Sequence, residues 1–271
     1  MGLFKKKEIT AVDFSKYVHE SDAKAMEALK AIPGFTALCK GFMKIWSEKQ
    51  YLIQNMSTNL KVSEEQLPKY YDMLQPICEK LGIERPELYI KLDVEPNAYT
   101  FGETNPFIVI TSGLIESFPD ELIRVVLAHE CGHIACHHSL YTTMGNIILD
   151  GAALGLGGLI SLPLQVAFYY WMRCSELSAD RAAAVYTGGS DKIVDMCMRF
   201  AGYTKDVNGK ANKEAFFQQA IEYKKLTDES KWNKTLEFIA LANSSHPFNS
   251  VRAYEIDKWC KTEEFQDMLD N

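Results

Sequence analysis

The sequence predicts an α+β protein that is mainly helical, with a small antiparallel sheet or hairpin beside one central helix. Three observations lead to this prediction. Apolar residues recur at helical spacing through most of the 271 residues. Residues 86–115 instead carry short β-branched and aromatic runs, which are typical of strands. The following segment, 119–138, returns to a helical pattern and contains the motif His129-Glu130-Cys131-Gly132-His133.

The composition is that of an ordinary globular protein and excludes some functions. A hydrophobic fraction of 47% over 271 residues is enough for a real core in one large or two small domains. The net charge is −7 and no basic stripe is present, so we expect no nucleic-acid partner. The seven cysteines are odd in number and show no disulfide spacing, so we expect reduced thiols and a cytoplasmic location.

The first 60 residues are expected to form a helical segment that packs on the core of a domain spanning residues 61–271. Residues 13–32 have a helical pattern of mixed charge. Residues 35–46 place six apolar side chains on one helical face, a stripe that suits either a membrane surface or, as we favour, a protein core. A further helix is expected over 64–81, where Gly82 would end it.

Three strands and the motif helix are expected next. Residues 88–92 read as a strand, and residues 98–101 and 107–111 read as the two arms of a β-hairpin with a longish turn. Pro119, Asp120 and Glu121 then mark a helix start, because acidic side chains are stabilised near the positive end of the helix dipole. We expect this helix to continue to about residue 138.

The spacing of His129 and His133 predicts a metal site. Residues four apart in a helix share a face, so both imidazoles can reach one ion. Glu130 lies about 100° round the helix, where it can reach a water on that ion without being a ligand. This set suits one zinc ion per chain, with Glu130 as general base for a water whose pKa zinc lowers to about 7. The same five residues also occur by chance in helices that bind no metal.

A third protein ligand has three candidate sources. A later histidine of the metzincin type is excluded, because Cys136 and Ser139 occupy the positions that this pattern needs. His137 is one more turn along, and a straight helix does not easily bring three turns onto one ion. Glu176 is the third source, with Asp180 on the same face to accept an N–H hydrogen bond from a ligating histidine. The competing interpretation of that pair is a solvated acidic face, although small and apolar residues surround it.

Residues 151–172 contain no charged side chain, which makes them a transmembrane candidate by length. One crossing would separate His133 from Glu176, and two crossings need about 40 apolar residues. We therefore expect buried helical segments, interrupted by three glycines and Pro163 and compatible with contact at a membrane surface. Beyond them, helices are expected near 174–187, 191–203, 212–225, 229–243 and 248–269.

Several ordered elements resemble the HtpX-like and CAAX-prenyl-protease-like zinc metallopeptidases, which are gluzincins. They are Asn97-Ala98-Tyr99-Thr100, Gly113-Leu114-Ile115, Asp120-Glu121-Leu122, the block from Val126 to His133, His138, the segment from Glu176 to Arg181, and Ser245-His246-Pro247 with Arg252. The resemblance covers about residues 65–260. Many relatives carry four or more clear transmembrane helices, so this chain is more similar to a soluble or peripheral branch.

The resemblance implies a zincin-like fold and a zinc metalloendopeptidase acting on unfolded or misfolded polypeptides. It implies that Asn97 and Ala98 line the cleft and pair with substrate. His246 would donate to the oxyanion of the tetrahedral intermediate or, equally, cap a helix, and Arg252 would hold a buried carboxylate near Asp180. The alternative function is a non-catalytic, zinc-stabilised interaction or chaperone-like protein. No oligomeric state is predicted.

Overall fold

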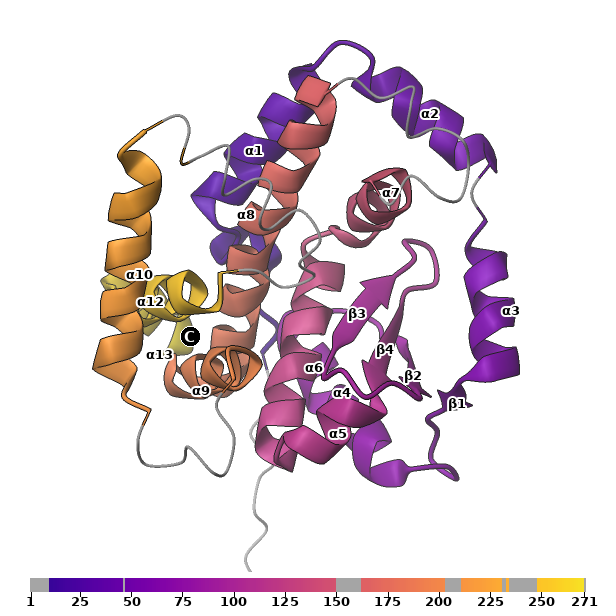
Figure 1. Ribbon diagram of the computed structural model, residues 1–271. Helices are drawn as coiled ribbons and strands as arrows, with labels where there is room; N and C mark the ends of the chain where they lie inside the picture. The colour runs from indigo at the N-terminus through magenta and orange to yellow at the C-terminus, as the bar shows by residue number, and fades with distance from the viewer. Residues whose placement is uncertain are drawn as a thin grey trace, which may run out of the picture.

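Two long helices form the centre of the molecule (Figure 1). The computed structural model describes residues 10–45, 47–149, 162–202, 211–230, 233 and 248–270. Helices α6 (Asp120–Ala135) and α8 (Leu162–Thr187) pack along each other. The sheet lies on the α6 side, and the later helices gather on the α8 side (Figure 1). These are α9 (Asp191–Phe200), α10 (Lys213–Asp228), α12 (Asn249–Trp259) and α13 (Glu263–Asp270).

Close contact between α6 and α8 depends on the glycine of the motif. A Cβ added at Gly132 would lie 2.7 Å from the Ala182 Cβ and 3.0 Å from the Ala179 Cα. Any larger residue would force the helices apart, because these distances are shorter than van der Waals contact. Gly132 and the alanines of α8 therefore let the carboxylates of α8 approach the histidines of α6.

The sheet has four strands in the order β1-β2-β4-β3, namely β1 (Leu60–Lys61), β2 (Glu87–Lys91), β4 (Phe107–Thr111) and β3 (Ala98–Phe101). The expected hairpin is confirmed, since β3 pairs antiparallel with β4 in the register Ala98↔Ile110. The sheet as a whole is mixed, because β2 pairs parallel with β4. Strand β4 lies between β2 and β3 and is buried along its whole length, and a period-two pattern does not reveal this strand order.

Most predicted helices occur, with shifted ends. In the N-terminal half the helices are α1 (Glu20–Ala31), α2 (Phe35–Ile45), α3 (Glu48–Thr58), α4 (Pro68–Leu81), α5 (Ser112–Ser117) and α7 (Ser139–Leu149), of which α3, α5 and α7 were not predicted. Gly82 ends α4 with a φ of 68°, as expected. Helix α6 ends at Ala135 rather than near 138, because His137 takes a left-handed φ of 57°.

In the C-terminal half, the observed helices begin and end at other places than the predicted ones. Helix α8 is one continuous helix of 26 residues, although a break was expected at Pro163. Pro163 does not break it, because it lies in the first turn, where the missing N–H costs no helical hydrogen bond. The predicted helix over 248–269 is two helices, α12 and α13. Three predicted features lie largely or wholly outside the described residues: the helix 229–243, of which only 229, 230 and 233 are described, the first part of the apolar run, and His246.

The N-terminal helices α1 and α2 pack against α8. Phe35 and Phe42 of α2 are buried in a cluster with Leu29 of α1 and with Phe168 and Trp171 of α8. The larger cluster lies between α4, α6, the sheet, α9 and α12. Among the helices described, none combines the length and apolarity that a membrane crossing requires.

Candidate metal centre

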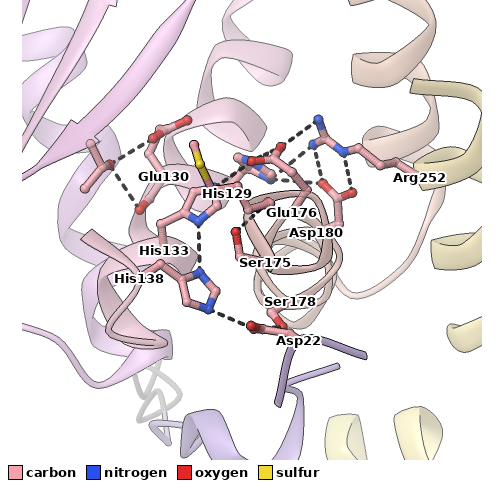
Figure 2. Close-up of polar contacts among 12 residues, drawn as sticks. Asp22, His129, Glu130, His133, His138, Ser175, Glu176, Ser178, Asp180 and Arg252 are labelled. Atoms are coloured by element: carbon pink, nitrogen blue, oxygen red, sulfur yellow. Dashed lines mark hydrogen bonds and ion pairs between the residues drawn. The ribbon is translucent and has the colours of Figure 1, made fainter. Parts of the chain in front are cut away.

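Three buried side chains converge between α6 and α8 (Figure 2). The Nε2 of His129 lies 3.4 Å from Glu176 Oε2, and the Nε2 of His133 lies 3.3 Å from Glu176 Oε1. One ligand atom from each of the three residues lies within 4.8 Å of the other two. Nitrogen and oxygen ligands about 2.0–2.1 Å from a tetrahedral ion are separated by roughly 3.3 Å, and each histidine nitrogen lies at about this distance from one of the two Glu176 oxygens.

The charges around the donors also suit a divalent cation. Three carboxylates, those of Glu130, Glu176 and Asp180, are buried beside one buried guanidinium, that of Arg252. These four groups carry a net charge of −2 when ionised, which a divalent cation would balance. Burial and the charge of Arg252 lower the pKa of His129, but hydrogen bonds to Asp180 and Glu176 outweigh them and raise it to about 9. The carboxylates therefore stabilise positive charge at this imidazole.

Asp180 orients His129 and is itself held by Arg252. Asp180 Oδ1 lies 2.9 Å from His129 Nδ1. The Nε and Nη2 atoms of Arg252 donate to Asp180 Oδ2 and Oδ1 at 2.8 and 2.6 Å. Arg252 Nη1 also lies 3.0 Å from Glu176 Oε2. Burial raises the pKa of Asp180, but the Arg252 guanidinium outweighs burial and holds this pKa below its ordinary value. An ionised Asp180 accepts a hydrogen bond from the Nδ1–H of His129, which leaves Nε2 to face Glu176.

Glu130 points from α6 toward the edge strand β3. The hydroxyl of Thr100, on β3, donates to Glu130 Oε2 at 2.8 Å and lies 3.3 Å from the Glu130 carbonyl oxygen. Both side chains are buried. Thr100 was not predicted as a site residue, although it belongs to the Asn97–Thr100 element that carried the resemblance.

The remaining predicted residues have different surroundings. Asn97 Oδ1 accepts from the Ala98 backbone N–H at 2.9 Å, and Ala98 is fully buried at the start of β3. His137 is 66% exposed, with its Nδ1 3.6 Å from Glu103 Oε1, away from the donor set. His138, in contrast, lies with Nδ1 3.0 Å from the Nδ1 of His133.

The seven cysteines all lie in the described part of the chain, and none of them forms a disulfide there. Cys131 is fully buried on α6 and Cys136 is partly buried at its end. Neither belongs to the group of side chains that could hold a metal among the described residues. The expectation that these two cysteines are small core or boundary residues is therefore confirmed.

Two imidazoles of α6 converge with one carboxylate of α8, and a second buried carboxylate lies next to the first imidazole on α6. This arrangement is that of a metallopeptidase of the H-E-x-x-H class. Residues 68–260 match the model of peptidase family M48, and the chain belongs to that family. It is therefore a metal-dependent hydrolase of polypeptides. The resemblance to HtpX-like metallopeptidases is confirmed.

Two named relatives show how much of the chain is similar to known metallopeptidases. The chain is 33% identical over 267 residues to the plastoglobule-localized metallopeptidase 48, chloroplastic, of Arabidopsis thaliana, a match that covers 97% of this chain and 76% of that protein. It is 30% identical over 138 residues to a protease HtpX homolog of Persephonella marina, covering 50% and 44%. No solved structure gives a significant match. Because the Arabidopsis protein is named as chloroplastic, the expected cytoplasmic location gains no support from it.

Proposed function

We propose that this protein is a zinc-dependent endopeptidase that cleaves unfolded or misfolded polypeptides. The observation that carries the proposal is the buried His129–His133–Glu176 set with Glu130 next to it on α6. Zinc is the ion of choice for two imidazoles and one carboxylate in a tetrahedral shell with an open position. His129, His133 and Glu176 would hold it, and one ion per chain fits the single donor set found among the described residues.

Zinc held by these residues would supply Lewis acidity toward a carbonyl oxygen and would lower the pKa of water. Glu130 accepts the proton of the attacking water and delivers it to the leaving amine. The hydrogen bond from Thr100 fixes the Glu130 carboxylate in one rotamer for this transfer. Asp180 and Arg252 keep His129 in the tautomer that presents Nε2.

The substrate would lie along β3, the strand at one edge of the described four-stranded sheet. An extended peptide can add to such an edge through backbone hydrogen bonds, next to Asn97 and Ala98. His246, which the resemblance offers as oxyanion donor, is retained as part of this proposal. An unfolded chain meets the requirement for an extended backbone better than a folded protein does.

A non-catalytic zinc protein is the alternative, and Glu130 argues against it. Structural zinc is normally closed by four protein ligands, whereas this set offers three. A zinc site that only stabilises the fold also gains nothing from a buried carboxylate that is held beside the metal by a threonine of a neighbouring strand.

The test compares Glu130→Gln with Glu121→Gln, a matched control on the exposed face of the same helix. Zinc content is measured by mass spectrometry, and cleavage is measured on fluorescently labelled, unfolded casein, with and without a chelator. We expect Glu130→Gln to keep its zinc and lose about 10²–10⁴-fold in rate, because it removes the general base. Glu121→Gln should behave as wild type. Parallel loss of zinc and activity in Glu130→Gln would show that Glu130 is a ligand instead.

A further inference from the structure

A chain of hydrogen bonds connects His133 with a carboxylate near the start of the protein (Figure 2). The Nδ1 atoms of His133 and His138 are 3.0 Å apart, and His138 Nε2 lies 2.8 Å from Asp22 Oδ2. Asp22 belongs to α1, whereas His138 follows the end of α6. All three side chains are buried, so the protein supplies their polar surroundings.

Helix α8 fixes the carboxylate of Asp22 from two sides. Trp171 Nε1 donates to Asp22 Oδ1 at 2.9 Å, and the Ser178 hydroxyl donates to Oδ2 at 2.6 Å. Burial raises the pKa of Asp22, but its interactions with His138, Ser178 and Trp171 outweigh burial and lower this pKa below its ordinary value. Asp22 is therefore an ionised acceptor with a fixed orientation.

The acceptor at one end determines where the protons lie along the chain. An ionised Asp22 can only accept hydrogen bonds, so the Nε2 atom of His138 carries a proton and donates a hydrogen bond to it. In a neutral His138 the other ring nitrogen, Nδ1, must then accept. His133 must donate from its own Nδ1, which leaves the lone pair of its Nε2 facing Glu176.

We propose that Asp22 is a positioning residue for the metal ligand His133 and acts through His138. The inference rests on the proposed function and extends it to a part of the chain outside residues 68–260, the part matched by the family model. Each histidine ligand then has its own carboxylate: Asp180 binds His129 directly, and Asp22 reaches His133 through one imidazole. Helix α1 is in this way part of the metal site.

Asp22→Asn tests the proposal with little change in shape. When the new amide oxygen accepts from Trp171, the new NH₂ group faces His138 Nε2, which must then accept. The His138 proton moves to Nδ1 and opposes the Nδ1 proton of His133. We expect zinc affinity, measured by competition with a chelator of known affinity, to fall about 10–100-fold. Long-range ¹⁵N NMR of the imidazoles should show His138 in the other tautomer. Glu27→Gln removes one negative charge at an exposed position on α1 and should change neither the zinc affinity nor the His138 tautomer.

His138→Phe breaks the chain from its middle and keeps an aromatic ring against Trp171. It should lose as much zinc affinity as Asp22→Asn, and the double variant should lose no more than His138→Phe alone, because Asp22 acts only through His138. If Asp22→Asn does not fold, His138→Phe must still show the loss by itself.

Wild-type zinc affinity in folded Asp22→Asn or His138→Phe, or additive losses in the double variant, would overturn the inference while leaving the metal site intact. A wild-type protein that binds no zinc would instead refute the proposed function.

Discussion

Removing the charge of Arg252 should destabilise the protein more than almost any other single substitution at the site. Arg252 is 2% exposed and makes three contacts of 2.6, 2.8 and 3.0 Å with the carboxylates of Asp180 and Glu176. Arg252→Met keeps much of the side-chain volume but leaves both carboxylates without this cation. The matched control is Arg124→Met, a half-buried arginine on α6.

The expected loss follows from the burial of this group. Charge-assisted hydrogen bonds contribute about 1.5–3 kcal/mol each, but three of them on one guanidinium are not additive. Breaking a buried ion pair by removing one partner costs about 3–5 kcal/mol, which is a large part of a typical stability of about 5–15 kcal/mol. We therefore expect the free energy of unfolding of the zinc-free protein to fall by about 3–5 kcal/mol.

Zinc should reduce this loss, because a divalent cation bound to Glu176 compensates the charge that Arg252 balanced. The assay is urea unfolding followed by circular dichroism, with and without saturating zinc, for the wild type and both variants. The expected order of losses is Arg252→Met without zinc, then Arg252→Met with zinc, then Arg124→Met. A loss below about 1 kcal/mol without zinc, or an equal loss in both conditions, would refute the reasoning that buried charge balance holds this site together.

Two further substitution pairs test individual roles. Glu176→Ala removes a proposed ligand and should lose zinc on dialysis. Asp180→Ala should lose about 10–100-fold in metal affinity and recover part of its activity in excess zinc. If the two variants behave alike and independently of zinc, the pair belongs to an acidic face that binds no metal. Thr100→Val removes the donor to Glu130 and should lower kcat about 10–100-fold at unchanged zinc content and nearly unchanged KM, since a hydrogen bond to a charged group contributes about 1.5–3 kcal/mol. Thr100→Ser should restore most of that kcat, and equal kcat values in the serine and valine variants would show that the hydroxyl has no such role.

The sequence determined the local features of the site. The four-residue spacing of His129 and His133 in a helix already places both imidazoles on one face, and the acidic pair Asp120 and Glu121 marks where that helix begins. The hairpin of β3 and β4 was equally readable, because its two arms are close in sequence and are separated by turn residues. Such features depend on backbone geometry over a few residues, which composition and spacing reflect directly.

Tertiary structure decided which distant residues meet. The approach of α8 to α6 at Gly132 brings Glu176 within 3.3 Å of His133. The sequence predicted this acid as the third ligand, but spacing alone does not show that it reaches the two histidines. The parallel pairing of β2 with β4 and the contact of Asp22 with His138 were not readable at all. These contacts join residues far apart along the chain, so their formation depends on how whole helices and strands pack, and no local periodicity encodes that packing.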